Sequence, residues 1–443
     1  MYKLVIVEGF ELAKSVLGRQ PLAELYSVSP VVKQRLREIF GVEIEPEQAV
    51  RQIISDVRQK GDASLVDYTL KIDGVNLITL EVSREQVSSA YQEVSQELVS
   101  ALTLAAERIR YFHNVQKDNV CNEFAEQGLG QLIRPLERVG IYVPGGTASY
   151  PSTVLMTAIP AKVAGVKELV LVTPPSRGVV PPAILVAADM AGVDRVFGIG
   201  GAQAVAALAF GTESVPKVDK ICGPGNIFVT LAKKLVYGVV DIDGLQGPSE
   251  VLIIADEAAN PRYCALDLLA QAEHDPSASA ILVTTSHRLA NEVAKEVEQQ
   301  LKELERQAIA SESLENRGVI AVVSNLDEAM ELANLYAPEH LCLMIDKADA
   351  YIDKVFNAGC VFVGENSTVV LGDYVAGPSH ALPTGGTARF SSPLNIVDFI
   401  KFISLVTIDE ANLGKLGQAA SVIARAEGFE AHARAVEERL KAD

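Results

Sequence analysis

The sequence predicts an α/β protein whose strands lie in parallel sheets. From about residue 137 onward, short apolar runs alternate with amphipathic or alanine-rich segments of helical length, as in KELVLVTPP followed by PPAILVAADMAG. Turns that contain glycine, such as GIGG and CGPGN, separate apolar runs from the helical segments that follow them. Strands that alternate with helices are joined by crossover connections, which place the strands parallel and the helices on the faces of the sheet.

Length and composition limit the classes of protein to which this chain can belong. Its 443 residues predict two or three domains, and 49% of them are hydrophobic, which is enough for a large buried core. No apolar run approaches the length of a membrane span. The net charge of −18 argues against nucleic acid and anionic membranes as partners, and it is compatible with a small cationic substrate.

The N-terminus and the cysteines indicate the compartment. The first residues, MYKLVIVEGFELAK, contain a short apolar run that Glu8 interrupts and no cleavage-site pattern, so we expect no signal peptide. The five cysteines are odd in number, and none of them forms a Cys-x-x-Cys pair. We therefore expect a reducing cytoplasm and no cysteine-based zinc site.

The first third of the chain is expected to be mainly helical. Residues 1–30 are expected to form a peripheral arm, and residues 31–60 and 84–117 have helical periodicity. Ser83 and Gln86 form the pattern of a capping box at the start of the latter helix. Between the two helical regions, an Asp-Gly turn precedes the short alternating run LITLEV.

The strand–helix alternation forms two series. The first runs from GIYVPGG to DKICGPGNIFVTLAKKLV, and Ser152 and Thr153 are expected to cap its alanine-rich helix, which ends at Ala164. The second begins at GPSEVLIIAD and ends at CVFVG. Besides the helix that ends in LAQAEHDP, the second series is expected to contain helices at 287–308, 325–336 and 347–357.

Two further regions follow the second series. Residues 366–395 are rich in Gly, Pro and Ser, and an irregular stretch of this length inside a compact protein is usually functional. From about residue 409 the chain reads as two amphipathic helices separated at Gly428. This acidic, alanine-rich end resembles an arm more than a layer of the core.

The segment LAQAEHDP is a candidate half of a metal site. Its helix is expected to begin with Asn260 as the N-cap and Pro261 at the first helical position, and to stop before Pro276. Gln271 and His274 are three residues apart, so their amide and imidazole share one face of the helix. Both groups are suitable ligands for a metal ion. The alternative, which this segment alone favours, is a hydrogen-bonded polar helix end.

The six histidines differ in their sequence context. His113 and His287 are expected on solvated helix faces. His340 follows Glu339 in YAPEHLCLMI, where Pro338 interrupts the helix and leaves the pair on the turn into the next strand. Adjacent Glu and His side chains supply two proton-transfer groups of different pKa, and turns at sheet edges are a common place for reacting groups. The alternative is a surface turn.

Two more segments carry candidate ligands. GDYVAGPSHALPTGG contains Asp373 and His380, and its glycines and prolines allow the backbone to approach a ligand closely. Asp373 is either a hard oxygen ligand or a turn-forming residue. EGFEAHARAVEERL contains Glu427, Glu430 and His432, and Glu430 is assigned to a solvated helix face.

Two glycine turns are candidate phosphate sites. GIGGAQ resembles a dinucleotide-binding fingerprint, but Gln203 stands in place of the third glycine. CGPGN also opens a helix, whose free N–H groups can meet a phosphate, although tight packing between strand and helix explains the same glycines. Cys222 in that turn is a candidate nucleophile toward an aldehyde, but a buried structural cysteine is favoured because no histidine lies near it in the sequence.

The residues alone thus indicate an acidic α/β protein with a His/Asp/Gln metal site and a Glu-His pair. They do not distinguish a metallohydrolase from a metal-assisted dehydrogenase. Eight segments taken together resemble the histidinol dehydrogenase family, in collinear order over nearly the whole chain and most weakly in residues 1–130: VPGGTASYPSTVLM, GGAQAVAALAFGT, CGPGN, GPSEVLIIAD, LAQAEHD, YAPEHL, GDYVAGPSHALPTGGTARFSSPL and EGFEAHARA.

The resemblance implies the last two steps of histidine biosynthesis, in which L-histidinol is oxidised through L-histidinal to L-histidine while two NAD molecules are reduced. It also implies one Zn²⁺ per subunit. By position, the family's zinc ligands correspond to Gln271, His274, Asp373 and His432, and its proton-transfer residues correspond to Glu339 and His340. Its NAD contacts correspond to Tyr142, Gln203 and Asn226. Its substrate contacts correspond to Ser249, His380 and Glu427, and the resemblance implies that Gln271, His274, His340, Asp373 and His432 also contact the substrate.

The resemblance further implies a homodimer with shared active sites and two Rossmann-like domains. On this basis residues 1–30 form an N-terminal arm, residues 31–140 with 249–394 form the first domain, which carries the zinc and catalytic residues, and residues 141–248 form the NAD-binding domain. Residues 395–443 form a C-terminal arm that is expected to cross to the partner subunit.

Two points depart from the expected pattern. The family usually has Ser-Pro or Thr-Pro before the loop aspartate, whereas this chain has Ser367-Thr368, which removes stiffness from the loop but no functional atom. Four protein ligands usually describe a closed zinc site, so a catalytic zinc would have to expand its coordination. The alternatives are a relative that oxidises another amino- or sulfo-substituted alcohol, a zinc hydrolase without NAD dependence, and an inactive paralogue that serves as an interaction protein.

Overall fold

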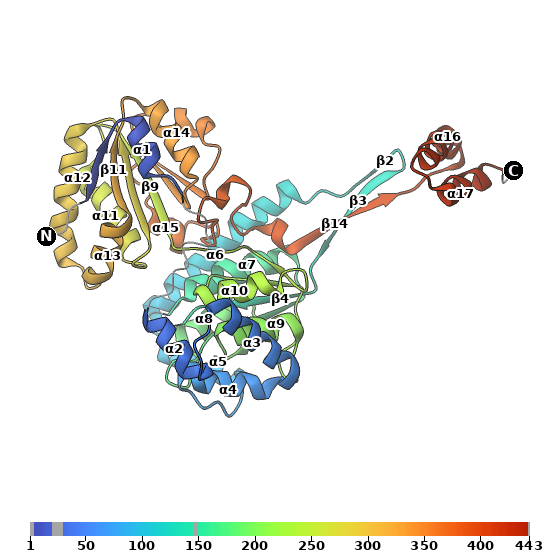
Figure 1. The fold of residues 1–443 in the computed structure, drawn as a ribbon, viewed down its shortest axis with the longest axis horizontal. Coiled ribbons are helices and arrows are strands. Elements are labelled where there is room, and N and C mark those ends of the chain that lie inside the picture. Colours follow the sequence, from blue (N-terminus) through green and yellow to red (C-terminus); the bar gives the residue numbers. More distant parts are fainter. Residues whose placement is uncertain (1–3, 20–29, 146–148, 442–443) are drawn as a thin grey trace. The chain divides into compact units, whose positions relative to one another are not determined.

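A computed structural model of the chain describes residues 4–19, 30–145 and 149–441. The chain forms two compact units (Figure 1). Unit 1 spans residues 1–117 and 136–399, and unit 2 spans residues 118–135 and 400–443. As expected, unit 1 is an α/β structure with parallel sheets. Among the described residues, no helix is both long enough and apolar enough to cross a bilayer.

The first sheet of unit 1 is parallel throughout, with the strand order β1-β11-β10-β9-β12-β13. Alternate residues of β9 belong to different cores: Val251 and Ile253 pack with α11, α12 and α13, whereas Leu252 and Ile254 pack with α1 and α14. Helices therefore cover both faces of the sheet. The strands are β1 (Val5–Glu8), β9 (Glu250–Ala255), β10 (Ser279–Thr284), β11 (Gly318–Val322), β12 (His340–Met344) and β13 (Cys360–Val363); the helices are α1 (Phe10–Val16), α11 (Pro261–Ala272), α12 (His287–Gln300), α13 (Gln307–Arg317) and α14 (Leu326–Tyr336).

The expected N-terminal arm is wrong for the described part of residues 1–30. Strand β1 pairs in parallel with β11 at the edge of the first sheet, and Val7, Ala13 and Leu17 are buried in the core that contains α14. The apolar run that ends at Glu8 is therefore a strand of the sheet, and its short length gave no indication of this. Residues 1–3 and 20–29 of the expected arm lie outside the described residues.

The second sheet of unit 1 is also parallel, with the order β6-β5-β4-β7-β8. From β4 the chain proceeds to β5 and β6 on one side and then to β7 and β8 on the other, so the direction of winding changes between β4 and β7. The strands are β4 (Arg138–Tyr142), β5 (Glu168–Val172), β6 (Arg195–Phe197), β7 (Lys220–Cys222) and β8 (Asp241–Ile242); the helices are α7 (Pro151–Ala164), α8 (Pro182–Ala191), α9 (Gly201–Phe210) and α10 (Ile227–Val236).

The N-terminal helices belong with this second sheet, which corrects the expected assignment of residues 31–140 to the other domain. Val50 and Ile53 of α3 and Leu65 of α4 share a core with Phe197 and α9. The expected boundary at 140/141 also falls inside β4. The periodicity of these helices predicts which face is buried, but it does not say against which sheet. The helices are α2 (Pro30–Phe40), α3 (Pro46–Lys60), α4 (Asp62–Asp73), α5 (Arg84–Glu93) and α6 (Gln96–Val120).

Helix starts agree with the sequence where the cap lies next to the first turn. Ser83 forms the expected capping box with Gln86, and Asn260 caps α11 ahead of Pro261. The expected cap of α7 is wrong, because Pro151 already occupies the first turn and Thr153 is buried inside the helix. The helix expected at 287–308 divides into α12, η2 (Leu301–Glu303) and the start of α13.

Other elements are shorter than expected. The run LITLEV makes only an isolated bridge between Glu81 and Phe197. The segment expected as a helix at 347–357 is the 3₁₀ helix η3 (Ala348–Lys354). The stretch 366–395 includes a short helix, α15 (Val369–Tyr374), and η4 (Thr387–Arg389), and is otherwise irregular.

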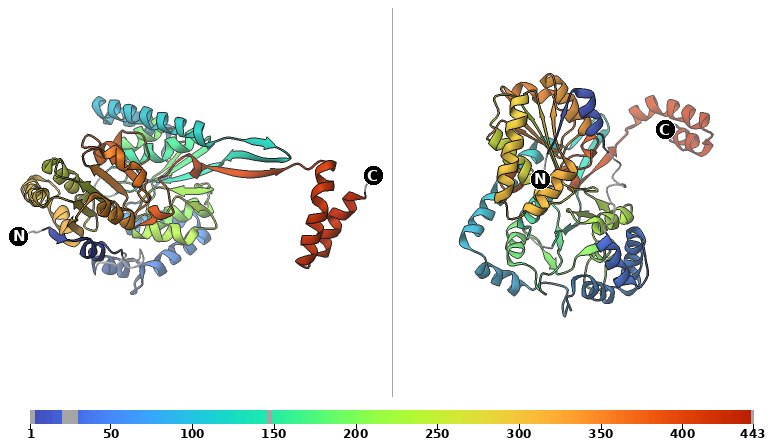
Figure 2. Two further views of the ribbon diagram at one scale, coloured as in Figure 1. Left: turned by 90° about the horizontal axis from the view of Figure 1, so that it is seen from above. Right: turned by 60° about the vertical axis from the view of Figure 1, so that its left-hand side comes forward.

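Unit 2 consists of a three-stranded antiparallel sheet, in the order β14-β3-β2, and two helices. It includes residues 118–135 in addition to the expected C-terminal segment, and η5 (Ile396–Phe399) belongs to unit 1. The helices pack on each other (Figure 2). Gly417 leaves room for Val436 and Leu440. The expected break at Gly428 is confirmed, with φ of 84°. The elements are β2 (Phe124–Glu126), β3 (Leu129–Pro135), β14 (Ile400–Val406), α16 (Glu410–Ala426) and α17 (Glu430–Leu440).

His113 is buried in α6, which corrects its expected place on a solvated helix face. Its Nδ1 atom lies 3.2 Å from Oε1 of Gln116, and its Nε2 atom has no hydrogen-bond partner among the described residues. Burial lowers the pKa of His113 to about 4, and the hydrogen bond to Gln116 opposes this only in part. The helical periodicity of residues 84–117 did not identify this position as buried.

Buried His113 makes stability depend on pH. Its pKa of about 4 in the folded protein lies below the ordinary value of 6.5, so the unfolded chain binds an extra proton between these values. The free energy of unfolding therefore falls as pH is lowered through this window. Between pH 7 and pH 5, we expect urea unfolding to give a loss about 2 kcal/mol larger for the wild type than for His113→Gln. The matched change at exposed His287 should leave the wild-type pH dependence intact; equal losses for wild type and His113→Gln would contradict the assignment.

Candidate active site

Glu339 and His340 lie at the amino end of β12, between β9 and the edge strand β13 of the first sheet. Helix α14 ends at Tyr336, Ala337 takes a left-handed conformation with φ of 52°, and Pro338 leads into the strand. His340 pairs with Val251 of β9 and Cys360 of β13, and only 3% of its surface is exposed. The pair is therefore a buried feature of the sheet rather than a surface turn.

Both side chains are held by the peptide groups of Glu250, the first residue of β9. The N–H of Glu250 donates to Oε2 of Glu339 at 2.8 Å, and Nδ1 of His340 lies 2.9 Å from the carbonyl oxygen of Glu250. A carbonyl oxygen can only accept, so Nδ1 carries the proton and Nε2 is the nitrogen left for chemistry. Nε2 is 3.5 Å from Oδ1 of Asp373 and has no hydrogen-bond partner among the described residues.

The pKa values of both residues are raised, although burial and charge oppose each other at each of them. Burial raises the pKa of Glu339 to about 7, although the charge of His340 opposes the shift. Burial would lower the pKa of His340, but the carboxylates of Glu339 and Asp373 raise it to about 9. A carboxyl group and an imidazole with such values can both exchange protons near neutral pH.

Asp373 and His380 come from the stretch 366–395, and the structure brings them to the same place. Nδ1 of His380 donates to the backbone oxygen of Asp373 at 2.8 Å, and Nε2 of His380 lies 3.3 Å from Oγ1 of Thr153 in α7. Burial raises the pKa of Asp373, but the nearby His340, followed by His380 and His274, lowers it below its ordinary value. The charge of the Asp373 carboxylate is thus stabilised by three imidazoles, of which that of His340 lies 3.5 Å from Oδ1.

Gln271 and His274 lie at the end of α11, close to Asp373. Gln271 is in the last turn, 3% exposed, and its Nε2 atom is buried without a hydrogen-bond partner in the described structure. His274 lies just beyond the C-cap Glu273, rather than inside the helix as expected, and is exposed. The amide of Gln271 is thus not closed off by hydrogen bonds within the described residues, as it would be in a fully hydrogen-bonded helix end.

The donors in unit 1 fit a zinc ion in part. An amide oxygen, an imidazole and a carboxylate are ligands that Zn²⁺ accepts. Among the described residues, no three His, Cys, Asp or Glu side chains are grouped so that they could hold a metal ion. Unit 1 contains three of the four expected ligands, namely His274, Asp373 and Gln271. The fourth expected ligand, His432, belongs to unit 2.

The expected NAD contacts lie beyond the carboxyl ends of the second sheet, around the point where its winding changes. Ligands in open parallel sheets usually bind at such a point. Tyr142 ends β4, and its hydroxyl oxygen accepts a hydrogen bond from the N–H of Gly201 at 3.0 Å. Gln203 is fully buried, and neither polar atom of its amide has a partner among the described residues. Asn226 caps α10 by accepting hydrogen bonds from Phe228 and Val229.

The remaining expected substrate residues lie in different units. Ser249 is partly exposed and directly precedes β9 in unit 1. Glu427 ends α16, and His432 lies in α17 with its ring 5.1 Å from that of Phe429, so both belong to unit 2.

Cys222 is fully buried, as expected for a structural cysteine, and burial raises its pKa well above the ordinary value. A buried, protonated thiol is a poor nucleophile. The aldehyde-binding alternative is therefore not favoured.

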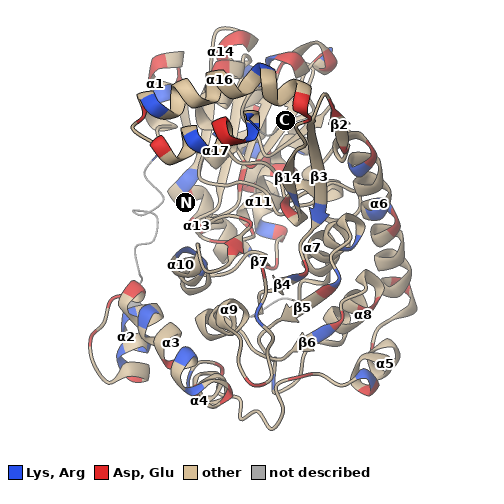
Figure 3. Ribbon diagram, turned by 90° about the vertical axis from the view of Figure 1, so that its right-hand side faces the viewer, with Lys and Arg blue, Asp and Glu red and all other residues tan. Residues whose placement is uncertain are grey.

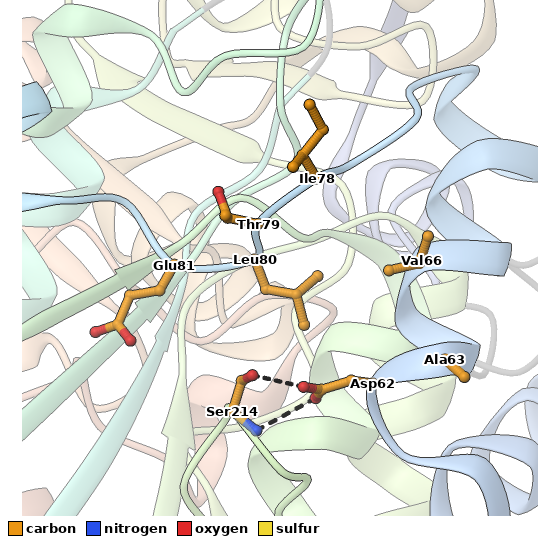
Figure 4. Close-up of a pocket in the computed structure, with 8 residues that line it drawn as sticks. All are labelled: Asp62, Ala63, Val66, Ile78, Thr79, Leu80, Glu81 and Ser214. Atoms are coloured by element: carbon orange, nitrogen blue, oxygen red, sulfur yellow. Dashed lines mark hydrogen bonds between the residues drawn. The ribbon is translucent and has the colours of Figure 1, made fainter.

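The structure also contains a hollow of about 410 Å³ away from these residues (Figure 4). Oγ of Ser214 donates to Asp62 there at 2.5 Å, and its backbone N–H donates to the same carboxylate at 3.3 Å. None of the lining side chains is a candidate site residue: Asp62, Ala63, Val66, Ile78, Thr79, Leu80, Glu81 and Ser214. The size of this hollow therefore says nothing about the chemistry around His340.

Sequence reasoning missed two residues of this site, Glu250 and Arg19. Glu250 supplies the peptide groups that hold Glu339 and His340, and its buried carboxylate is paired with Arg19. No spacing pattern connects residue 19 with residues 250 and 339, so only the folded chain identifies them.

Comparison with known proteins agrees with the geometry. The family described as histidinol dehydrogenase matches residues 41–440. A histidinol dehydrogenase from Dehalococcoides mccartyi is 58% identical over 437 residues, covering 98% of this chain and 100% of that protein. One from Deinococcus radiodurans is 51% identical, covering 96% and 98%. The crystal structure of histidinol dehydrogenase from Elizabethkingia anophelis superposes with a TM-score of 0.88 at 37% identity, covering 100% and 99%. The chain therefore belongs to the histidinol dehydrogenase family.

Proposed function

We propose that the protein catalyses the zinc-dependent, NAD-linked, four-electron oxidation of L-histidinol to L-histidine through L-histidinal, the last steps of histidine biosynthesis. Family membership supports the oxidation of histidinol. The observation that carries the mechanism is the buried pair Glu339–His340, whose free Nε2 atom lies 3.5 Å from Asp373. The second parallel sheet, with its glycine turns GIGGAQ and CGPGN, favours an NAD-linked enzyme over a zinc hydrolase.

Gln271, His274 and Asp373, together with His432, would hold the zinc ion. Bound there, zinc would supply a Lewis acid that holds and orients the amino and imidazole nitrogens of the substrate. The lowered pKa of Asp373, which keeps its carboxylate ionised, supports its assignment, and Gln271 would bind through its amide oxygen.

The protein's own residues would move the protons. His340 in its neutral form, which a pKa of about 9 makes the minor form at pH 7, takes the hydroxyl proton of histidinol through Nε2 while a hydride passes to NAD. Glu339 then accepts a proton from the water that adds to the aldehyde, and His340 assists the second hydride transfer. A pKa of Glu339 raised to about 7 suits a general base that works near neutral pH.

NAD and histidinol would each contact a separate set of residues. NAD contacts Tyr142, Gln203 and Asn226, at the carboxyl ends of the second sheet. Histidinol contacts Ser249, His380 and Glu427, and the last two suit its imidazole and ammonium groups. Because His380 is hydrogen bonded to Thr153 of α7, its ring links the second sheet to the loop of Asp373.

We propose a homodimer in the cytoplasm, in which unit 2 of one subunit completes the site of the other. Helix α16 carries few charged residues along its length (Figure 3). Apolar side chains of unit 2 are exposed in the single chain, which supports their burial against a second copy. They include Phe402, Val406, Leu416, Val422, Ile423 and Phe429. The free cysteines are in keeping with a reducing compartment.

The experiment that tests the proposed function is the yield of NADH per histidinol consumed, with and without a chelator. We expect two NADH per histidinol and the loss of both when the metal is removed. Consumption of histidinol without NADH would contradict the dehydrogenase, and full activity after verified removal of zinc would contradict the metal.

His274→Ala should abolish turnover without unfolding the protein, because the cores of unit 1 are apolar layers on two sheets rather than a metal cluster. Circular dichroism should show the wild-type spectrum, and zinc content should fall. The exposed control His287→Ala should keep both zinc and activity. A melted spectrum for His274→Ala would make the metal structural.

A further inference from the structure

Glu250 connects the candidate catalytic pair to the rest of the fold. Its N–H binds the carboxylate of Glu339, and its carbonyl oxygen binds the imidazole of His340. Its own side chain is 6% exposed and points away into a set of fixed partners. The orientation of both catalytic side chains therefore depends on where this single residue is held.

Arg19 is the main partner of that side chain. Its two terminal nitrogens each lie 2.6 Å from one carboxylate oxygen of Glu250, which is the bidentate geometry of a strong charge-assisted pair. The N–H of Gly385 donates to the same carboxylate at 3.0 Å. Three directions of hydrogen bonding therefore restrain the carboxylate.

Arg19 also holds the segment that leads into the catalytic pair. Its Nε donates to the carbonyl oxygen of Tyr336 at 2.6 Å, a terminal nitrogen donates to that of Ala337 at 3.2 Å, and the guanidinium lies 3.7 Å from the centre of the Tyr336 ring. Tyr336 and Ala337 end α14 just before Glu339. One guanidinium thus joins the start of β9 to the chain that enters β12.

We propose that Arg19 and Glu250 are positioning residues that set the geometry of Glu339 and His340, an inference that rests on the proposed function for its kinetic consequence. A buried ion pair adds little net stability, because burial of the two charges costs about as much as their attraction returns. The planar fork of arginine instead defines a direction for each partner, which a lysine cannot do. The function of the pair is therefore alignment.

The test compares Arg19→Lys and Glu250→Gln with a matched control. Arg195 forms a similar fork with Glu81, at 2.8 and 2.6 Å, far from the candidate pair in the sequence and on the other sheet, so Arg195→Lys makes the same chemical change elsewhere. For the two positioning variants we expect kcat to fall about 100-fold, as for a small misplacement of catalytic groups, with KM for NAD unchanged. Arg195→Lys should retain wild-type kcat.

A double-mutant cycle separates alignment from general damage. In the oxidation of histidinol to histidinal, where His340 is the proton acceptor and Glu339 is not required, Arg19→Lys should cost nothing further in the His340→Asn background, whereas independent effects would multiply. Circular dichroism should be native for every variant. A kcat of folded Arg19→Lys and Glu250→Gln equal to that of the wild type, or losses that multiply in the cycle, would overturn the proposal.

An NMR measurement that does not depend on turnover tests the positioning role separately from the proposed reaction. In protein with ¹⁵N-labelled histidine, the Nδ1 proton of His340 is identified as the resonance lost in His340→Asn. Arg19→Lys should shift or broaden it, and Arg195→Lys should not. An unshifted resonance in Arg19→Lys overturns the positioning role; a wild type that makes no NADH, with the shift present, overturns only the proposed reaction.

Discussion

His340→Asn should slow the oxidation of both histidinol and histidinal, whereas Glu339→Gln should slow chiefly the oxidation of histidinal. His340 offers its Nε2 atom to the substrate in both steps, while Glu339 is needed where water adds to the aldehyde. Loss of a general base costs about 10²–10⁴-fold in rate. Rates measured with each compound supplied separately, at saturating NAD, give the comparison.

The His340→Asn substitution is chosen because it can preserve the hydrogen bond to Glu250. Asparagine can still donate to the carbonyl oxygen of Glu250, so His340→Asn removes the proton acceptor with little change in the hydrogen bond that holds the side chain. His287→Asn makes the same change on the surface and should leave both rates unchanged. Equal losses for both substrates in Glu339→Gln would contradict its assignment to the water-dependent step.

Co-expression of Asp373→Ala with His432→Ala should restore about a quarter of wild-type activity, although each variant alone is inactive. If unit 2 of one subunit completes the site of the other, a mixed dimer collects both defects in one site and leaves the second intact. Random pairing makes about half of the dimers mixed, so about a quarter of all sites are complete, as two-fold symmetry requires. Steady-state NADH formation per subunit measures the fraction.

A second pairing provides the matched control. Asp373→Ala with Gln271→Ala places both defects in unit 1, so every site in a mixed dimer carries one defect and no activity should return. Different affinity tags on the two chains allow mixed dimers to be isolated and counted. If isolated mixed dimers of Asp373→Ala and His432→Ala are no more active than the separate variants, each chain builds its own site.

Local structure could be predicted where the determining residues are neighbours in sequence. The caps at Ser83 and Asn260 depend on side chains within one turn, and both form as expected. Tertiary placement could not be predicted in the same way. The apolar face of α3 was evident from its periodicity, but its packing against α9 rather than the first sheet depends on the whole chain.

The sequence predicted which residues form the candidate site better than it predicted where those residues lie in the fold. Glu339 and His340 were expected on a turn at a sheet edge; they lie in the interior, where the strand enters between β9 and β13, because Ala337 and Pro338 end α14 abruptly. The proximity of Asp373 to His340, 3.5 Å between Oδ1 and Nε2, depends on the tertiary structure, because the two residues are 33 positions apart in the sequence. Arg19 had no recognisable motif at all.

The pairing of β1 with β11 imposes an order on synthesis at the ribosome. Val5–Glu8 emerges several hundred residues before Gly318–Val322, the strand to which it must pair. At ribosomal rates of about 5–20 residues per second, roughly 15–60 s pass before that partner is made. During this time the apolar N-terminal strand has an open edge, and Arg19 has neither Glu250 nor Tyr336 to bind. Strand β1 is thus paired late in synthesis, and until then its open edge can pair with other chains.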